Sequence, residues 1–257
     1  MFKKLLASIG VGGAKVDTQL DNPRLYPGDV LRGKVVVQGG KAAQDIEKIE
    51  LVLMIEAEDD SNDDARVNLP LGSLRVSQAF TIRAEERREF PFEIQLPADL
   101  PINSLPYHGQ PLPIWIHTDL AIDAAIDTND RDFLEILPPA PVSTLLQAFD
   151  QLGWGISSTD VELGTARVGH VSSTLGCYQE IELRPRGGSF RIQEIELTFL
   201  PYGNETHVLI EVDSRFGSDF YASLVMGPDF AHRDWVNELR AQLPLTEGHS
   251  SPSISPL

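Results

Sequence analysis

The chain has 257 residues, 42% of them hydrophobic, a net charge of −17 and a single cysteine. This hydrophobic content suffices for packed cores and excludes global disorder, and no apolar run approaches the roughly 18 residues that span a bilayer. The acidic surface repels phosphate backbones and argues against a general nucleic-acid role, while the lone Cys177 rules out an internal disulfide and favours the cytoplasm.

The first predicted element is an amphipathic helix over residues 2–9. Its apolar side chains recur at i, i+3, i+4 and i+7, with lysines off the stripe. So short a helix is marginal alone in water, so it docks on its own domain, in a partner's groove or on an anionic membrane. Docking within the chain is favoured over binding to a partner or to a membrane. The candidate partner-binding residues here are Phe2, Lys3, Lys4, Leu5, Leu6 and Ile9.

Positive charge is concentrated in the same part of the chain. All six lysines lie between Lys3 and Lys48, and residues 1–48 carry eight Lys and Arg against five Asp and Glu. That stretch has a net charge of +3, so the remainder carries −20. Only the N-terminal stretch is therefore expected to approach an anionic surface.

Alternation of apolar and polar residues predicts about seven strands before residue 140, with Pro-Gly and charged turns between them. This pattern is typical of a β-sandwich. We assign residues 1–138 to an N-terminal domain. The expected strands cover residues 14–20, 35–38, 44–58, 75–86, 88–97, 112–123 and 132–139.

The acidic run at residues 56–64 resembles part of a calcium-binding loop. Asp60, Asn62 and Asp64 fit its first three positions, but Ala65 stands in place of the glycine and Leu71 in place of the bidentate glutamate. We expect an acidic hairpin tip here, with no metal bound.

A proline-rich loop over residues 103–113 joins two of the predicted strands. Tyr107 and His108 lie at its tip, and loops on a rigid scaffold commonly carry recognition. Both are candidate partner-binding residues, although a purely structural turn explains the loop equally well.

Five aspartates and one arginine gather over fourteen residues before the first domain ends. An ion network between the domains, a solvated strand edge and a divalent-metal site are the alternatives, and an interdomain polar network is favoured. The spacing matches no calcium loop and lacks its glycine. The residues are Asp119, Asp123, Asp127, Asp130, Arg131 and Asp132.

Pro138-Pro139-Ala140-Pro141 is the strongest linker signal in the chain. A helix from Val142 to the Gly153 region follows, then further strands and a final amphipathic helix over residues 234–243. We assign residues 142–243 to a smaller C-terminal sandwich with helices, and we expect residues 244–257 to form a disordered tail.

Catalytic patterns are weak. Cys177 lies seven residues from His170, but nothing nearby would lower the pKa of its thiol, and we expect a packed side chain. His117 and Asp119 point to the same face of a strand, yet two residues alone do not make a metal site. We therefore expect no enzyme, no cofactor and no bound metal.

With these elements identified, the chain resembles the bacterial sporulation-control protein family, whose members have an arrestin-like fold. The resemblance covers most of residues 2–155. It implies an all-β protein with two tandem arrestin-like sandwiches, acting as a regulatory adaptor without catalysis. The matching segments are FKKLLASIGVGGAKVDT, YPGD with GKV and GGKAAQDI, REFPFEIQLP, HTDLAIDAAIDTNDRD, and the helix ending in LGW.

Two hypotheses follow. The first is a non-enzymatic scaffold of bacterial developmental or division control, which binds protein partners through strand edges or loops and could form a homodimer. The second is a divalent-metal-binding module or hydrolase that uses the Asp119–Asp132 cluster. Peripheral membrane association through the N-terminal lysines is a third option.

Overall fold

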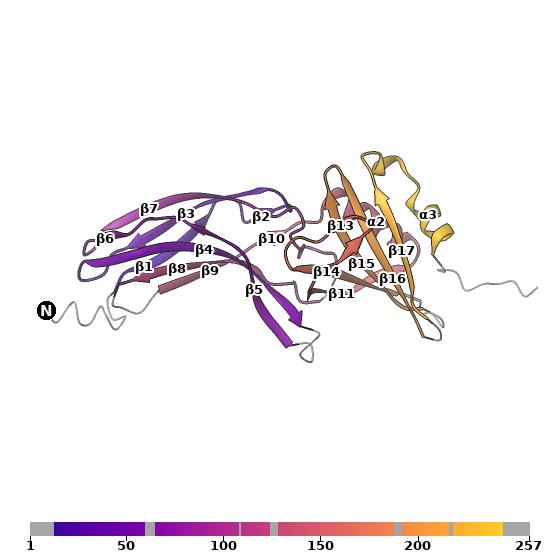
Figure 1. Ribbon diagram of the computed structural model, residues 1–257, viewed down its shortest axis with the longest axis horizontal. Helices are drawn as coiled ribbons and strands as arrows, with labels where there is room; N and C mark the ends of the chain where they lie inside the picture. The colour runs from indigo at the N-terminus through magenta and orange to yellow at the C-terminus, as the bar shows by residue number, and fades with distance from the viewer. Residues whose placement is uncertain are drawn as a thin grey trace, which may run out of the picture.

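The computed structural model describes residues 13–59, 65–107, 109–123, 128–187, 192–215 and 218–243. Figure 1 shows an elongated molecule, with one body of strands from the N-terminal half and a second body that contains the C-terminal strands and helices. Within those residues, no helix has both the length and the apolar character needed to cross a bilayer. The prediction of a mostly β protein is confirmed.

The described residues of the N-terminal half form ten strands joined by turns and loops. They are β1 (Lys15–Leu20), β2 (Arg24–Leu25), β3 (Val30–Gln38), β4 (Gln44–Asp59), β5 (Ala65–Arg75), β6 (Phe80–Ile82), β7 (Arg87–Gln95), β8 (Ile114–Ile122), β9 (Thr128–Phe133) and β10 (Glu135–Ile136).

Two sheets face each other in this half. One has the order β1-β3-β7, and the other is built on the long strand β4, which pairs with β8 on one side and with β5 and β6 on the other. Alternating apolar residues of β3, β4 and β8 fill the space between them, and Val35, Leu51 and Ile116 are fully buried. The short parallel pair β2–β10 brings the end of this half back beside its beginning.

A buried pair of threonines joins the two sheets. The hydroxyls of Thr18 on β1 and Thr118 on β8 lie 2.6 Å apart, and both side chains are buried. Thr118→Val should destabilise the chain by about 1–2 kcal/mol, because it leaves the Thr18 hydroxyl buried without this partner. Replacing both residues by valine should recover most of that loss. Urea unfolding of the two variants checks this, and an equal or larger loss in the double variant would contradict it.

The C-terminal half begins at α2 (Ala140–Gln151). It continues with β11 (Trp154–Leu163), β12 (Arg167–Val168), β13 (Val171–Ser172), β14 (Cys177–Pro185), β15 (Ile192–Tyr202), β16 (Glu205–Ser214), β17 (Phe220–Met226), the 3-10 helix η2 (Phe230–His232) and α3 (Trp235–Gln242).

Five of these strands form one antiparallel array in the order β17-β16-β15-β14-β11. One face of it is apolar and packs against the helices, with Phe149 of α2 and Leu239 of α3 among the buried residues. The small β12–β13 hairpin packs against the other face through Val168, Val171 and Leu200. A single parallel pairing of Glu162 on β11 with Glu58 on β4 makes the array continuous with the N-terminal sheet.

Several elements differ from the sequence expectation. Helix α2 starts at Ala140, inside the expected linker, because Pro141 occupies the first helical turn, where its missing N–H is not needed. Residues 65–75 form β5, an edge strand that accommodates Pro70 beside a bulge at its pairing with β4. Strand β17 was not anticipated. The domain boundaries and the arrestin-like character of the two halves stay predictions.

Candidate functional site

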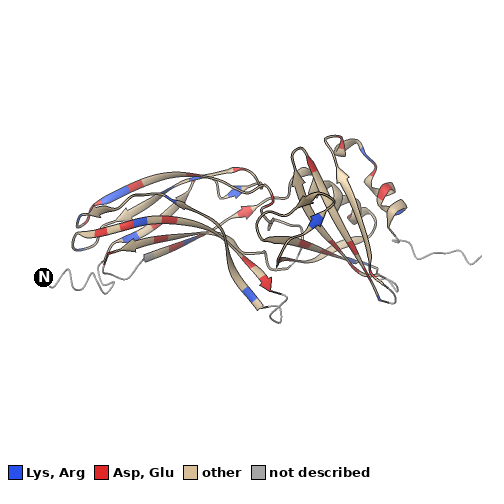
Figure 2. Ribbon diagram, in the orientation of Figure 1, with Lys and Arg blue, Asp and Glu red and all other residues tan. Residues whose placement is uncertain are grey.

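Acidic residues recur along the strands of the C-terminal sheet (Figure 2). Their carboxylates gather on the face that points away from the helices. The sequence causes this directly, because QEIEL occurs in both β14 and β15 and places every second residue of each strand on this face. We call this surface the acidic face. It comprises Asp160, Glu162, Glu180, Glu182, Glu194, Glu196, Glu211 and Asp213.

The strand register aligns like charges across the acidic face. Glu182 lies opposite Glu196, and Glu196 lies opposite Glu211 on the next strand. Glu194 lies opposite Asp213 in the same way. Like charges directly opposite each other in a sheet are destabilising, so this surface weakens the fold that carries it.

The raised pKa values of these carboxyls reflect burial first and this crowding second. Burial, and then the charge of Glu196, raises the pKa of Glu180 to about 8. Burial, and then Asp213, raises the pKa of Glu196 to about 7. The pKa of Asp213 is also raised, first by burial and then by Asp219. The charge of the acidic face therefore changes near neutral pH.

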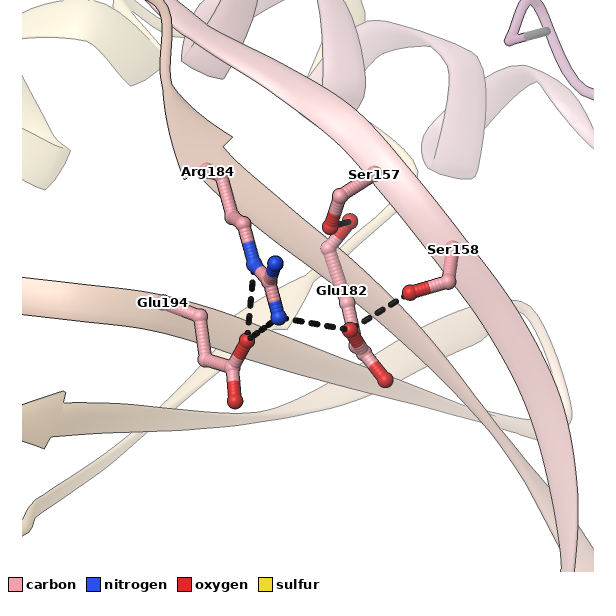
Figure 3. Close-up of polar contacts among 5 residues, drawn as sticks. All are labelled: Ser157, Ser158, Glu182, Arg184 and Glu194. Atoms are coloured by element: carbon pink, nitrogen blue, oxygen red, sulfur yellow. Dashed lines mark hydrogen bonds and ion pairs between the residues drawn. The ribbon is translucent and has the colours of Figure 1, made fainter. Parts of the chain in front are cut away.

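One guanidinium offsets part of this charge. The Nε and Nη2 atoms of Arg184 donate to one carboxylate oxygen of Glu194, at 3.0 and 2.7 Å (Figure 3). Nη2 also lies 3.9 Å from Glu182, whose carboxylate accepts a hydrogen bond from the Ser158 hydroxyl at 2.5 Å. This network holds Glu182 and Glu194 in place at one end of the acidic face.

Some of these carboxylates lie close enough together to share a cation. Their oxygens fall within 4.8 Å of one another in three sets, which are Asp160–Glu162–Glu180, Glu194–Glu196–Asp213 and Glu211–Asp213–Asp219. Oxygen donors of this kind suit Ca²⁺ or Mg²⁺. Exposed acidic groups are nevertheless common without an ion.

A second feature is the joint between the two halves. The side-chain amide of Gln179 on β14 pairs with the backbone of Ile102, accepting from its N–H at 2.8 Å and donating to its C=O at 2.7 Å. The carboxylate of Asp99 accepts from the backbone N–H of Thr174 at 2.6 Å and from its hydroxyl. We call these four residues the interdomain joint.

A cavity of about 230 Å³ lies beside the interdomain joint. Pro27, Leu100 and Pro101 line it from the N-terminal half, and Val142 and Phe199 from the C-terminal half. The cavity is partly open to solvent, and residues of both halves line it.

The aspartate series lies on β8 and β9 of the N-terminal half. Asp130 accepts from the Thr18 N–H at 2.8 Å and thereby ties β1 to β9. Arg131 lies over the ring of Trp115, 4.7 Å from its centroid. Burial, and then Asp130 and Asp17, raises the pKa of Asp132 to about 6. These contacts stay within one half, so they lend no support to an interdomain network.

The metal hypothesis for this series gains no support either. Asp119 pairs with Asn129 along the strands, and Asp123 follows β8 with its backbone N–H bonded to Asp45. Among the described aspartates of the series, no three bring ligand atoms within 4.8 Å of one another. Asp127 lies outside the described residues.

The predicted partner-binding residues lie mostly outside the described residues, as Phe2, Lys3, Lys4, Leu5, Leu6, Ile9 and His108 all do. Tyr107 is described, and its hydroxyl donates to the Gln110 carbonyl at 2.5 Å. Burial, and then Asp160 of β11, raises its pKa, so the 103–113 loop approaches the C-terminal half. The role of these residues in partner binding stays a prediction.

Cys177 is buried in β14. Burial, and then Asp99, raises the pKa of its thiol to about 11, which opposes formation of the thiolate needed for nucleophilic attack. Its expected role as a packed side chain is consistent with this environment.

The chain matches the model of the family described as SpoOM protein over residues 2–216. It is 36% identical, over 219 residues, to the sporulation-control protein spo0M of Bacillus subtilis, covering 83% of this chain and 81% of that protein. The crystal structure of Spo0M, the sporulation control protein from Bacillus subtilis, superposes with a TM-score of 0.75 at 27% identity, covering 90% of this chain and 98% of that one.

Proposed function

Because the chain belongs to the SpoOM protein family, we propose that it is a non-enzymatic regulatory adaptor that binds protein partners in the cytoplasm. The curated relative is named a sporulation-control protein, which supports a regulatory role. The lone, buried cysteine fits a reducing compartment. In this proposal, two arrestin-like β-sandwiches present binding surfaces to a partner, and their relative orientation regulates binding.

The observation that carries the proposal is the interdomain joint. The two halves meet through a few directed hydrogen bonds beside a cavity, through apolar contacts and through the single β4–β11 pairing. Contacts of this kind permit more than one arrangement. A partner that binds both halves would favour one arrangement over the others, in proportion to its difference in affinity for them. Such a shift is how an adaptor without catalysis could transmit a signal.

Deletion of residues 1–10 tests the predicted contribution of the N-terminal segment. We expect the shortened chain to capture a different set of proteins from cells of the source organism, or to give a different solution-scattering profile. A second deletion, of the predicted tail 244–257, serves as the control. An unchanged set of captured proteins together with unchanged scattering would count against a role for Phe2, Lys3 and the apolar stripe.

A further inference from the structure

Strand β17 ends the sheet, and its outer edge has no strand partner among the described residues. The carbonyl of Val225 accepts from Arg233 Nη1 at 3.2 Å, a contact that places this carbonyl at the outer edge. Backbone groups of alternate residues in a strand point to opposite edges, so those of Tyr221 and Ser223 face outward too. Their N–H and C=O groups form an open hydrogen-bonding template.

Exposed apolar side chains gather on this strand. Phe220, Tyr221 and Val225 are 40%, 60% and 39% exposed. Natural proteins usually protect an open edge with charges, prolines or a covering segment, and exposed apolar residues there mark an interaction site. Arg233 covers only the Val225 end, where its charge is offset by an ion pair with Glu238.

The charge beside the edge identifies the kind of strand that fits. The row of carboxylates Glu182, Glu196 and Glu211 continues in register to Tyr221, whose hydroxyl contacts Glu211. A residue paired with Tyr221 on an added strand would extend this row. A lysine or arginine at that position has the length and charge to reach Glu211 across Tyr221.

We propose that the β17 edge binds an extended basic segment of a partner protein, which adds to the sheet as a further strand and places its Lys or Arg side chains over the acidic face. The inference rests on the proposed function in that the occupant is a protein. A second copy of this chain is the poorer fit, because it would bring another acidic face and a charge of −17. Strand β17 follows residue 216, where the family match ends.

A defined probe tests this proposal with the full-length chain. The fluorescent heptapeptide Lys-Val-Lys-Val-Lys-Val-Lys has a basic side chain at every second position, so one face of the added strand can lie over the acidic face. Fluorescence anisotropy measures its binding at low salt. A control peptide of the same sequence carries a methyl group on the backbone nitrogen of each lysine. It keeps the side-chain charges but loses the backbone N–H groups that would pair with β17 in this register. We expect the unmodified peptide to bind roughly tenfold or more tightly than the methylated one.

Variants of the chain locate the binding. Ser223→Pro removes an N–H that faces outward and leaves the β16 ladder intact, while Ser223→Ala keeps that N–H and serves as its control. We expect three- to tenfold weaker binding for S223P alone. Glu211→Gln should weaken binding several-fold at low salt, whereas Glu93→Gln on β7 should not.

Equal affinity of the two peptides, no binding at millimolar concentration, or equal effects of S223P and S223A would overturn the proposal. So would edge-dependent dimerisation of the free chain that S223P abolishes, measured by sedimentation, because a second copy would then be the occupant. If S223P folds poorly, the affinity of E211Q for the peptide and the affinity of the unmodified chain for the methylated peptide still test the proposal. If the β17 edge does not bind the peptide but the chain still captures cellular proteins, this inference is wrong and the proposed adaptor role is unaffected.

Discussion

Replacing both Glu180 and Glu196 by glutamine is expected to stabilise the chain at pH 8.5 by roughly 2 kcal/mol, or about 4–8 °C in Tm. The two carboxyls have pKa values of about 8 and about 7 in the folded state. At pH 8.5 the folded state must therefore hold charges that the sheet disfavours. The estimate is smaller than the pKa shifts alone imply, because both side chains are partly exposed and screened by solvent.

The sign of the pH dependence follows from proton linkage. Between about pH 4.5 and pH 8 the folded chain holds more protons on these two carboxyls than the unfolded chain, so their contribution to stability falls as pH rises. The gain from the double substitution should therefore be largest above pH 8 and vanish near pH 4.5. Thermal unfolding across this range measures it. Glu93→Gln, an exposed carboxylate paired with Arg32, is the matched control.

A pH-independent gain, or a gain as large in E93Q, would contradict the assigned cause. A gain that persists with the expected pH profile would mean that the acidic face is retained at a cost in stability. Surfaces that weaken a fold in this way are commonly functional.

Gln179→Leu is expected to loosen the interdomain joint and to cost about 2 kcal/mol in unfolding free energy. The substitution nearly preserves side-chain volume but leaves the N–H and C=O of Ile102 without the amide that now binds both. Solution scattering should report a broader distribution of distances, because only Asp99–Thr174, the β4–β11 pairing and the apolar contacts described above would then hold the halves.

Gln147→Leu provides the control, since Gln147 is exposed on α2. Scattering profiles that coincide for Q179L, Q147L and the unmodified chain would show that the Gln179–Ile102 hydrogen bonds do not set the orientation of the two halves. Destabilisation without any change in scattering would lead to the same conclusion.

Much of the fold could be predicted from local pattern. The alternation in QEIEL marks β14 and β15, and that in IWIHTDLAI marks β8, because a strand places successive side chains on opposite faces. Strand β5 was missed because Pro70 and Gly72 read as breakers, although an edge strand with a bulge tolerates both. Helix α2 begins at Ala140, before the predicted start at Val142, because proline in the first turn is compatible with a helix.

The candidate site was harder to predict because it depends on register. The glutamates of QEIEL are visible in the sequence, yet nothing local says that Glu182 faces Glu196 and Glu211. The aspartate series suggests a cluster because its members are neighbours in sequence, but Asp130 contacts β1 and Arg131 lies over Trp115 in the folded chain. Alternating Glu with Ile or Leu in neighbouring strands was the available signal.

We propose above that this chain binds protein partners on surfaces whose relative orientation depends on the interdomain joint. Quantitative affinity capture of the full-length chain from cells of the source organism, with Q147L, Q179L and a tag-only control, tests it most directly. We predict proteins enriched equally by the unmodified chain and by Q147L, and at least several-fold less by Q179L. No enrichment over the tag-only control in growing or stationary cells would contradict the claim, as would identical enrichment by Q179L and Q147L.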